Sequence, residues 1–315
     1  MTAKADRMPA SVIDAELPDI AALEPAETIR RRWPTIVGGL ISAAMVVMLG
    51  RELLGSGLEG LSRTTPDSPW FYLAFFCLYM AAPTGDFIIF RRLWRIPLSG
   101  FVALHKKRIA NDVVLGYSGE AYFYAWARAR ANIVAAPFGA VKDVSLLSAI
   151  AGNTVTILLC AIALPIGYQL MSPNVLHAVA GSAAITLVIS LLMLIFSRRI
   201  FSLPRQQLRW IFWIHTGRIA ASSLFVALAW HFAMPDVALG VWLFLAAARL
   251  LVSRLPLVPN KDLLFASFAI LVIGQDEALS AMIAFVAALT LGVHLLLVLV
   301  FSGAAGWKGL RLWRG

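Results

Sequence analysis

The chain has 315 residues, of which 60% are hydrophobic and 14% are charged, and its mean hydropathy is +0.80. Soluble domains usually carry about 25% charged residues. These values exclude an ordinary soluble protein and indicate that most of the chain lies in lipid. The formal net charge of +10 fits basic loops beside anionic lipid headgroups. No nucleic-acid-binding motif accompanies this charge, so we expect no nucleic-acid partner.

Residues 1–33 differ from the rest of the chain. Acidic residues alternate with prolines and alanines there, and the segment ends in Arg30-Arg31-Arg32-Trp33. No apolar run follows a basic start, so the segment is not a signal peptide. We predict a disordered cytoplasmic tail that ends in a basic and aromatic anchor at the membrane interface.

A membrane-spanning helix needs about 20 mainly apolar residues. The stretches that meet this condition are 34–54, 69–90, 143–170, 177–197, 208–233 and 277–303. We expect the third to begin at Asp143. Cys77 and Cys160 lie inside such stretches and are predicted to fill the core. No metal-ligand spacing or phosphate-binding glycine loop is visible, so we expect no cofactor.

Two further segments are too polar to span a bilayer and too apolar to be loops. Residues 97–137 turn at Gly116–Glu120, and residues 237–275 turn at Arg254–Asp262. Each segment predicts two short helices that meet at a charged tip. Backbone that is not helical at membrane depth is tolerated only inside protein or around water. We therefore expect two re-entrant hairpins that enclose a polar chamber.

Basic clusters orient the chain, because cytoplasmic loops carry an excess of Lys and Arg. The clusters lie at 30–32, 91–95, 198–209 and 308–314. All are cytoplasmic if both termini face the cytoplasm of a bacterial inner membrane and each hairpin returns to the side it left. The predicted fold is an all-α integral membrane domain, 34–303, with about six spanning helices and two re-entrant helical hairpins. It forms an inverted repeat, 34–170 and 177–303, and a basic cytoplasmic tail, 304–315, follows it.

Charged side chains of the hairpins form the candidate site, because ionisable residues at membrane depth usually face a cavity. The predicted substrate-binding residues are Lys107, Arg108, Glu120, Arg128, Arg254, Lys261 and Asp262. The excess of cations favours an anionic ligand, since Arg and Lys both bind phosphate well. For the cations of the first hairpin, an alternative is that they reach lipid phosphates at the membrane surface.

The stretch Gly116-Tyr117-Ser118-Gly119 also matches the G-x-S-G motif of rhomboid proteases. Ser118 would be the nucleophile and His294 its base, and the base must lie within hydrogen-bond reach of the serine. The alternative is a tight turn, in which the glycines supply conformational freedom. Other histidines, such as His215, match no metal spacing and are predicted to be core or interfacial residues.

At the two turns the chain resembles the transmembrane module of the lysylphosphatidylglycerol synthase and flippase family. The likeness rests on Gly116-Tyr117-Ser118-Gly119-Glu120 and on the proline-rich turn Leu255–Asp262, whose family counterpart is richer in glycine and ends in Glu. The resemblance implies passage of lipid headgroups between leaflets, with a homodimer as one arrangement. No aminoacyl-transferase domain follows residue 303, so we expect the lipid-aminoacylating reaction to be absent.

These observations predict a flippase that moves a phosphate-bearing lipid, either a phospholipid or a polyprenyl-phosphate carrier, between leaflets. Cations of the two hairpins would bind the phosphate from opposite sides. Glu120 and Asp262 would balance these charges and accept protons that couple transport. The alternatives are an intramembrane enzyme, either a rhomboid-like protease or a lipid-phosphate transferase, and a non-catalytic partner of another membrane enzyme.

Overall fold

A computed structural model gives the fold of the chain. The residues that it describes are 65–114, 118–129, 137–170, 201–254, 261–273 and 276–312, with scattered positions in 36–47 and 173–188. All elements in these ranges are helices: α3 (Pro69–Trp94), α4 (Ser99–Val113), α5 (Ser118–Arg128), α6 (Pro137–Leu170), α8 (Arg205–Ala233), α9 (Leu239–Arg254), α10 (Lys261–Ile273) and α11 (Asp276–Leu312).

Four of the described helices are long and apolar enough to cross a membrane. They are α3, α6, α8 and α11, with candidate spans at Pro69–Trp94, Phe138–Ala163, Arg205–Ala233 and Glu277–Phe301. The prediction of an all-α membrane protein is therefore confirmed. The expected spans 34–54 and 177–197, like the N-terminal tail, lie largely outside the described residues.

The remaining helices form two short pairs. α4 and α5 have 15 and 11 residues, and α9 and α10 have 16 and 13. Each is shorter than the about 20 residues that a spanning helix needs. The prediction of paired short helices in 97–137 and 237–275 is confirmed. α5 begins at Ser118, inside the predicted turn Gly116–Glu120, and α9 ends at Arg254, where the second predicted turn begins.

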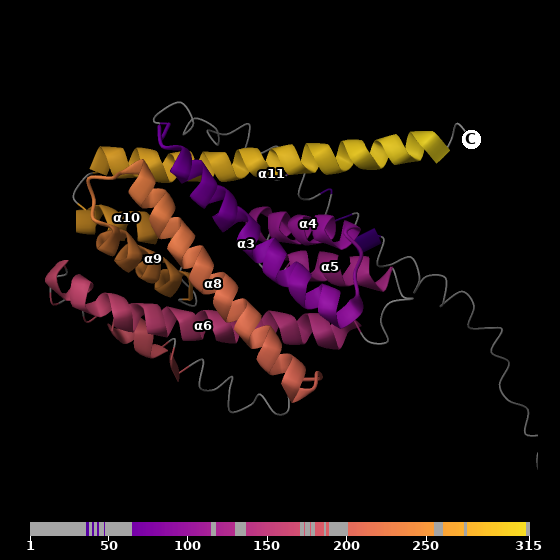
Figure 1. The fold of residues 1–315 in the computed structure, drawn as a ribbon, viewed down its shortest axis with the longest axis horizontal. Helices are drawn as coiled ribbons and strands as arrows, with labels where there is room; N and C mark the ends of the chain where they lie inside the picture. The colour runs from indigo at the N-terminus through magenta and orange to yellow at the C-terminus, as the bar shows by residue number, and fades with distance from the viewer. Residues whose placement is uncertain are drawn as a thin grey trace, which may run out of the picture.

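The order of the helices and their contacts recur in the two halves of the chain. α3 packs on α4, α4 on α5 and α5 on α6, just as α8 packs on α9, α9 on α10 and α10 on α11. α4 also contacts α11, and α9 contacts α6. α3 and α8 pack along each other in the centre, with α4 and α5 towards one end of the molecule and α9 and α10 towards the other (Figure 1).

One predicted boundary is wrong. α6 begins at Pro137 rather than at Asp143, because proline suits the first turn of a helix. Asp143 lies deeper in α6, is fully buried, and accepts hydrogen bonds of 2.7 Å from the backbone N–H groups of Ser202 and Leu203. α11 continues past residue 303 to Leu312, so the basic C-terminal segment extends the last helix.

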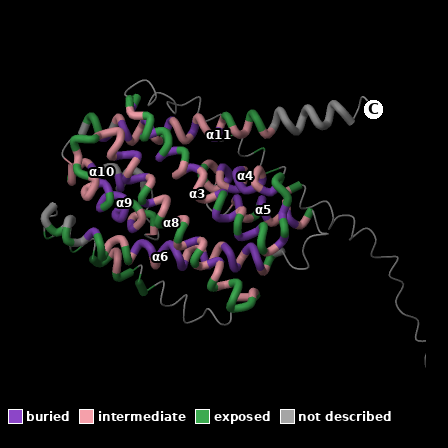
Figure 2. Tube along the Cα trace, viewed as in Figure 1, coloured by how far each residue is buried: buried purple, intermediate pink, exposed green. Residues whose placement is uncertain are grey.

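Buried side chains gather where the helices cross. One cluster joins α3, α4, α5 and α6 around Phe90, Leu104 and Phe123, and another joins α8, α9 and α10 around Trp230, Trp242 and Phe265. Figure 2 shows buried stretches where the helices pack on one another and exposed ones on the outer faces of the bundle. In a membrane protein an apolar outer face contacts lipid. The polar side chains that the fold buries are therefore the unusual ones.

Candidate functional site

The site begins at a break in the hydrogen-bonding pattern of α3. Pro83 lies inside this helix and has no N–H group, so the carbonyl oxygen of Tyr79, four residues earlier, loses its helical partner. Arg108 of α4 donates a hydrogen bond to that oxygen, and its guanidinium lies 4.1 Å from the centre of the Tyr79 ring. A proline in α3 thereby fixes the position of a cation on α4.

Gly85 makes room for a second cation. A Cβ atom at this position would overlap the aliphatic part of the Arg218 side chain, which comes from α8. The missing side chain lets the two central helices approach with an arginine between them. Arg218 donates from Nη2 to Ser148 Oγ at 2.7 Å and from Nε to His215 Nδ1 at 2.8 Å.

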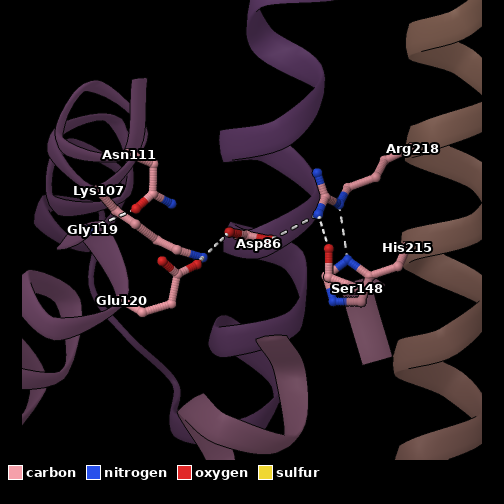
Figure 3. Close-up of polar contacts among 8 residues, drawn as sticks. All are labelled: Asp86, Lys107, Asn111, Gly119, Glu120, Ser148, His215 and Arg218. Carbon is pink, nitrogen blue, oxygen red and sulfur yellow. Dashed lines mark hydrogen bonds and ion pairs between the residues drawn. The ribbon is translucent and has the colours of Figure 1, made fainter. Parts of the chain in front are cut away.

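Asp86, the next residue of α3, lies between two cations (Figure 3). Its Oδ2 atom is 2.6 Å from Lys107 Nζ, and its Oδ1 atom is 4.0 Å from Arg218 Nη2. Lys107 Nζ is also 3.3 Å from Glu120 Oε1. The Lys107 ammonium group thus contacts carboxylates from two different helices, α3 and α5. Lys107 is therefore a cation held by two carboxylates.

α5 fits closely against α4 because of Gly119. A Cβ atom there would overlap the backbone carbonyl oxygen of Lys107, and the Gly119 N–H donates to Asn111 Oδ1 at 2.7 Å. This contact holds Glu120, in the first turn of α5, beside Lys107. The Ser118 hydroxyl donates to the Ala110 carbonyl at 2.8 Å. That bond fits a turn better than a nucleophile, whose proton a base must hold.

Arg254 reaches the site from the other helix pair. It ends α9, and its guanidinium lies against Gly152 of α6, where a Cβ atom would overlap it. Arg254 thus enters a bundle of apolar helices through a gap that glycine leaves. Arg249, one and a half turns earlier on α9, lines the neighbouring cavities.

These side chains enclose a cavity of about 320 Å³. Its charged lining residues are Asp86, Lys107, Arg108, Asp112, Glu120, Arg218 and Arg254, four cations and three carboxylates. Two further cavities adjoin it. One, of about 290 Å³, shares Arg218 and Arg254, and the other, of about 910 Å³ and lined mainly by apolar residues, shares Arg108 and Asp112. The arrangement provides a polar chamber next to a space suited to hydrocarbon.

The structure brings four of the predicted site residues together: Lys107, Arg108, Glu120 and Arg254 all line the polar cavity. Arg128 ends α5, is half-buried, and does not line it. Lys261 and Asp262 begin α10, but the structure does not describe their side chains. Their predicted roles stay predictions.

Sequence reasoning missed the central residues on the long helices. Asp86 and Arg218 lie inside the predicted spans 69–90 and 208–233, where averaging over an apolar window hides a single charge. The available signal was the charge itself, because an ionisable residue in a spanning segment usually marks a functional site. His215, interpreted as a core residue, is buried and hydrogen-bonded to Arg218. Within the described ranges, no cluster of His, Cys, Asp and Glu could hold a metal ion.

Comparison with known proteins adds no identification. The chain matches no family model, and neither the curated proteins nor the solved structures give a match.

Proposed function

We propose that this protein is a lipid transporter that moves a phosphate-bearing lipid between membrane leaflets. The observation that carries the proposal is the polar cavity among apolar helices, where four cations face three carboxylates. Charges at membrane depth are costly and usually line a substrate or ion pathway. Arginine and lysine together suit phosphate, because guanidinium binds two oxygens in a plane and ammonium acts as a point charge.

The charges favour an anion as the transported group. Counting Arg249 of the adjoining cavities, five cations and three carboxylates line the connected space, which leaves a formal excess of two positive charges. Asp86 and Glu120 already neutralise Lys107. Arg218 and Arg254 line both the polar cavity and the cavity beside it, so we assign the phosphate to these two arginines.

The neighbouring large cavity, most of whose lining residues are apolar, supports a lipid rather than a free anion. A headgroup in the polar chamber would leave its hydrocarbon chains beside Phe75, Val226 and Ile283, which line the larger cavity. Chains that move from the bilayer into this cavity exchange one apolar environment for another, so the gain is that the apolar lining keeps them away from the charges. The protein thus offers a polar environment to the headgroup and an apolar one to the hydrocarbon chains.

The proposal includes a topology. About six spanning helices, counting 34–54 and 177–197, and two re-entrant pairs, α4–α5 and α9–α10, form an inverted repeat with both termini in the cytoplasm of a bacterial inner membrane. The recurring contacts of the two halves support the repeat. Short or interrupted helices at matching places in two halves mark the binding site in many transporters. This arrangement agrees with the resemblance to the lysylphosphatidylglycerol flippase module, which remains part of the proposal.

Lipid scrambling in proteoliposomes of phosphatidylglycerol and phosphatidylcholine tests the proposal. Arg254→Ala and Glu120→Gln are each expected to slow scrambling about tenfold or more, equal to about 1.4 kcal/mol of barrier. Arg205→Ala is the matched control, because Arg205 is exposed at the start of α8 and lies outside the cavities. Unchanged rates in both cavity variants would remove the site assignment, and no scrambling by the wild type would remove the function.

A further inference from the structure

The large cavity contains a second polar group of residues, which the transport proposal does not use. Tyr79 of α3 and His294 of α11 both line it, and their ring centres are 5.6 Å apart. They are only 4% and 2% exposed. The Tyr79 hydroxyl and the His294 Nε2 atom have no hydrogen-bond partner among the described residues. Buried polar atoms without partners are rare in folded proteins and call for an explanation.

One cation, Arg108, and one carboxylate, Asp112, lie beside this pair. The Arg108 guanidinium lies over the Tyr79 ring at 4.1 Å, and Asp112 Oδ2 is 3.6 Å from His294 Nε2. A distance of 3.6 Å is too long for a hydrogen bond. An incoming phosphate would meet the Asp112 carboxylate here, whereas an uncharged acceptor would meet a phenol hydroxyl that can donate. The pair therefore suits a neutral polar group.

The position of the pair indicates which neutral polar group of a lipid would reach it. Arg108 and Asp112 line both the polar cavity and the large one, so Tyr79 and His294 lie at the boundary between charge and hydrocarbon. In a diacyl glycerolipid the groups between the headgroup and the chains are ester carbonyls, which accept hydrogen bonds. A polyprenyl phosphate has no such carbonyl between its phosphate and its chain.

We propose that Tyr79 and His294 form a subsite for the acyl-ester carbonyl of a glycerophospholipid. The inference rests on the proposed transport function and decides between its two substrate classes in favour of the phospholipid. The headgroup phosphate occupies the polar cavity, the ester carbonyl lies between the phenol and the imidazole, and the chains fill the space of about 910 Å³. That volume is at the upper end of the about 300–1,000 Å³ typical of ligand sites.

The test compares two lipids with one headgroup: diacyl phosphatidylglycerol and its dialkyl ether analogue, which lacks the carbonyls. The wild type is expected to scramble the diacyl lipid about tenfold faster than the ether lipid. Tyr79→Phe and His294→Leu are expected to lower the diacyl rate to the ether rate and to leave the ether rate unchanged. A merely structural role would lower both rates together. Thr290→Val is the control, because Thr290 lines the same cavity but already donates to the Val286 carbonyl.

A second readout separates this inference from the transport proposal. In detergent, diacyl phosphatidylglycerol is expected to raise the melting temperature of the wild type more than the ether lipid does, and the difference should vanish in Tyr79→Phe. If that difference appears without scrambling, the subsite stands and the transport function fails. Equal rates and equal thermal shifts for the two lipids overturn the subsite, even if scrambling is robust.

Discussion

The two short helix pairs occupy matching places in the helix packing but carry different side chains. α4 and α5 bury Lys107 against Asp86 and Glu120, and they are tied to each other through Gly119. The buried residues described on α9 and α10 are apolar, and Arg254 alone among the described side chains of this pair reaches the polar cavity.

This difference suggests that the two pairs contribute differently to stability and to transport. The first pair supplies charges that are already neutralised by partners, so removing one leaves others uncompensated in a buried space. The second pair supplies an arginine that a glycine of α6 accommodates. Changes in the first pair should therefore act on stability as well as on transport, and changes around Arg254 mainly on transport. The predictions below test that contrast in order of decreasing effect.

The largest effect is expected for Lys107→Met. The substitution leaves Asp86 and Glu120 buried without their cation, and breaking a buried ion pair on one side costs about 3–5 kcal/mol. Thermal and denaturant unfolding in detergent measure the change. Lys106→Met, one residue away and half-buried, is the control and should stay within about 0.5 kcal/mol of the wild type. Equal stability of the two variants would contradict the ion-pair assignment.

Gly119→Ala is expected to destabilise the protein by about 1–3 kcal/mol, the usual range for overpacking. The added methyl group would meet the Lys107 backbone carbonyl, which cannot move without shifting α4. The same unfolding measurement checks this prediction. In the control Gly217→Ala, the methyl group has open space on a helix, so the effect should be neutral or stabilising by up to about 1 kcal/mol. Similar losses in both variants would count against the close contact of α4 and α5.

Gly152→Ala should affect scrambling without a comparable effect on stability. The methyl group would displace the Arg254 guanidinium, and a flexible side chain can yield at little cost. Stability is expected to change by less than about 1 kcal/mol, while scrambling falls about fivefold, equal to about 1 kcal/mol of barrier. If the variant has normal stability and scrambles lipid at the wild-type rate, the position of Arg254 does not affect transport.

Ser118→Ala should have the smallest effect. It removes one hydrogen bond to the Ala110 carbonyl, which is worth about 1 kcal/mol, and leaves scrambling at the wild-type rate. Incubation with a labelled membrane peptide measures the alternative activity. Cleavage that the wild type performs and Ser118→Ala abolishes would favour the intramembrane protease and remove the distinction drawn between the two pairs.

The sequence predicts the helices better than the contacts between them. Gly116–Glu120 and Arg254–Asp262 contain breakers and charges in otherwise apolar surroundings, so the turns are legible locally. The partners of Lys107 and Arg254 cannot be predicted from the local sequence, because Asp86 and Gly152 belong to distant helices and only packing brings them together. Asp143 shows the same limit: a helix-starting role follows from local sequence, whereas its actual partners are some 60 residues away.

The buried Asp143 has a mechanical consequence. It joins α6 of the first half to the backbone N–H groups of Ser202 and Leu203, just before α8 begins. A charge-assisted double contact of this kind resists stretching, so we expect α6 and α8 to stay together at this end. If a lipid enters between these two helices, we expect the opening to lie at the far end, near the C-terminus of α8.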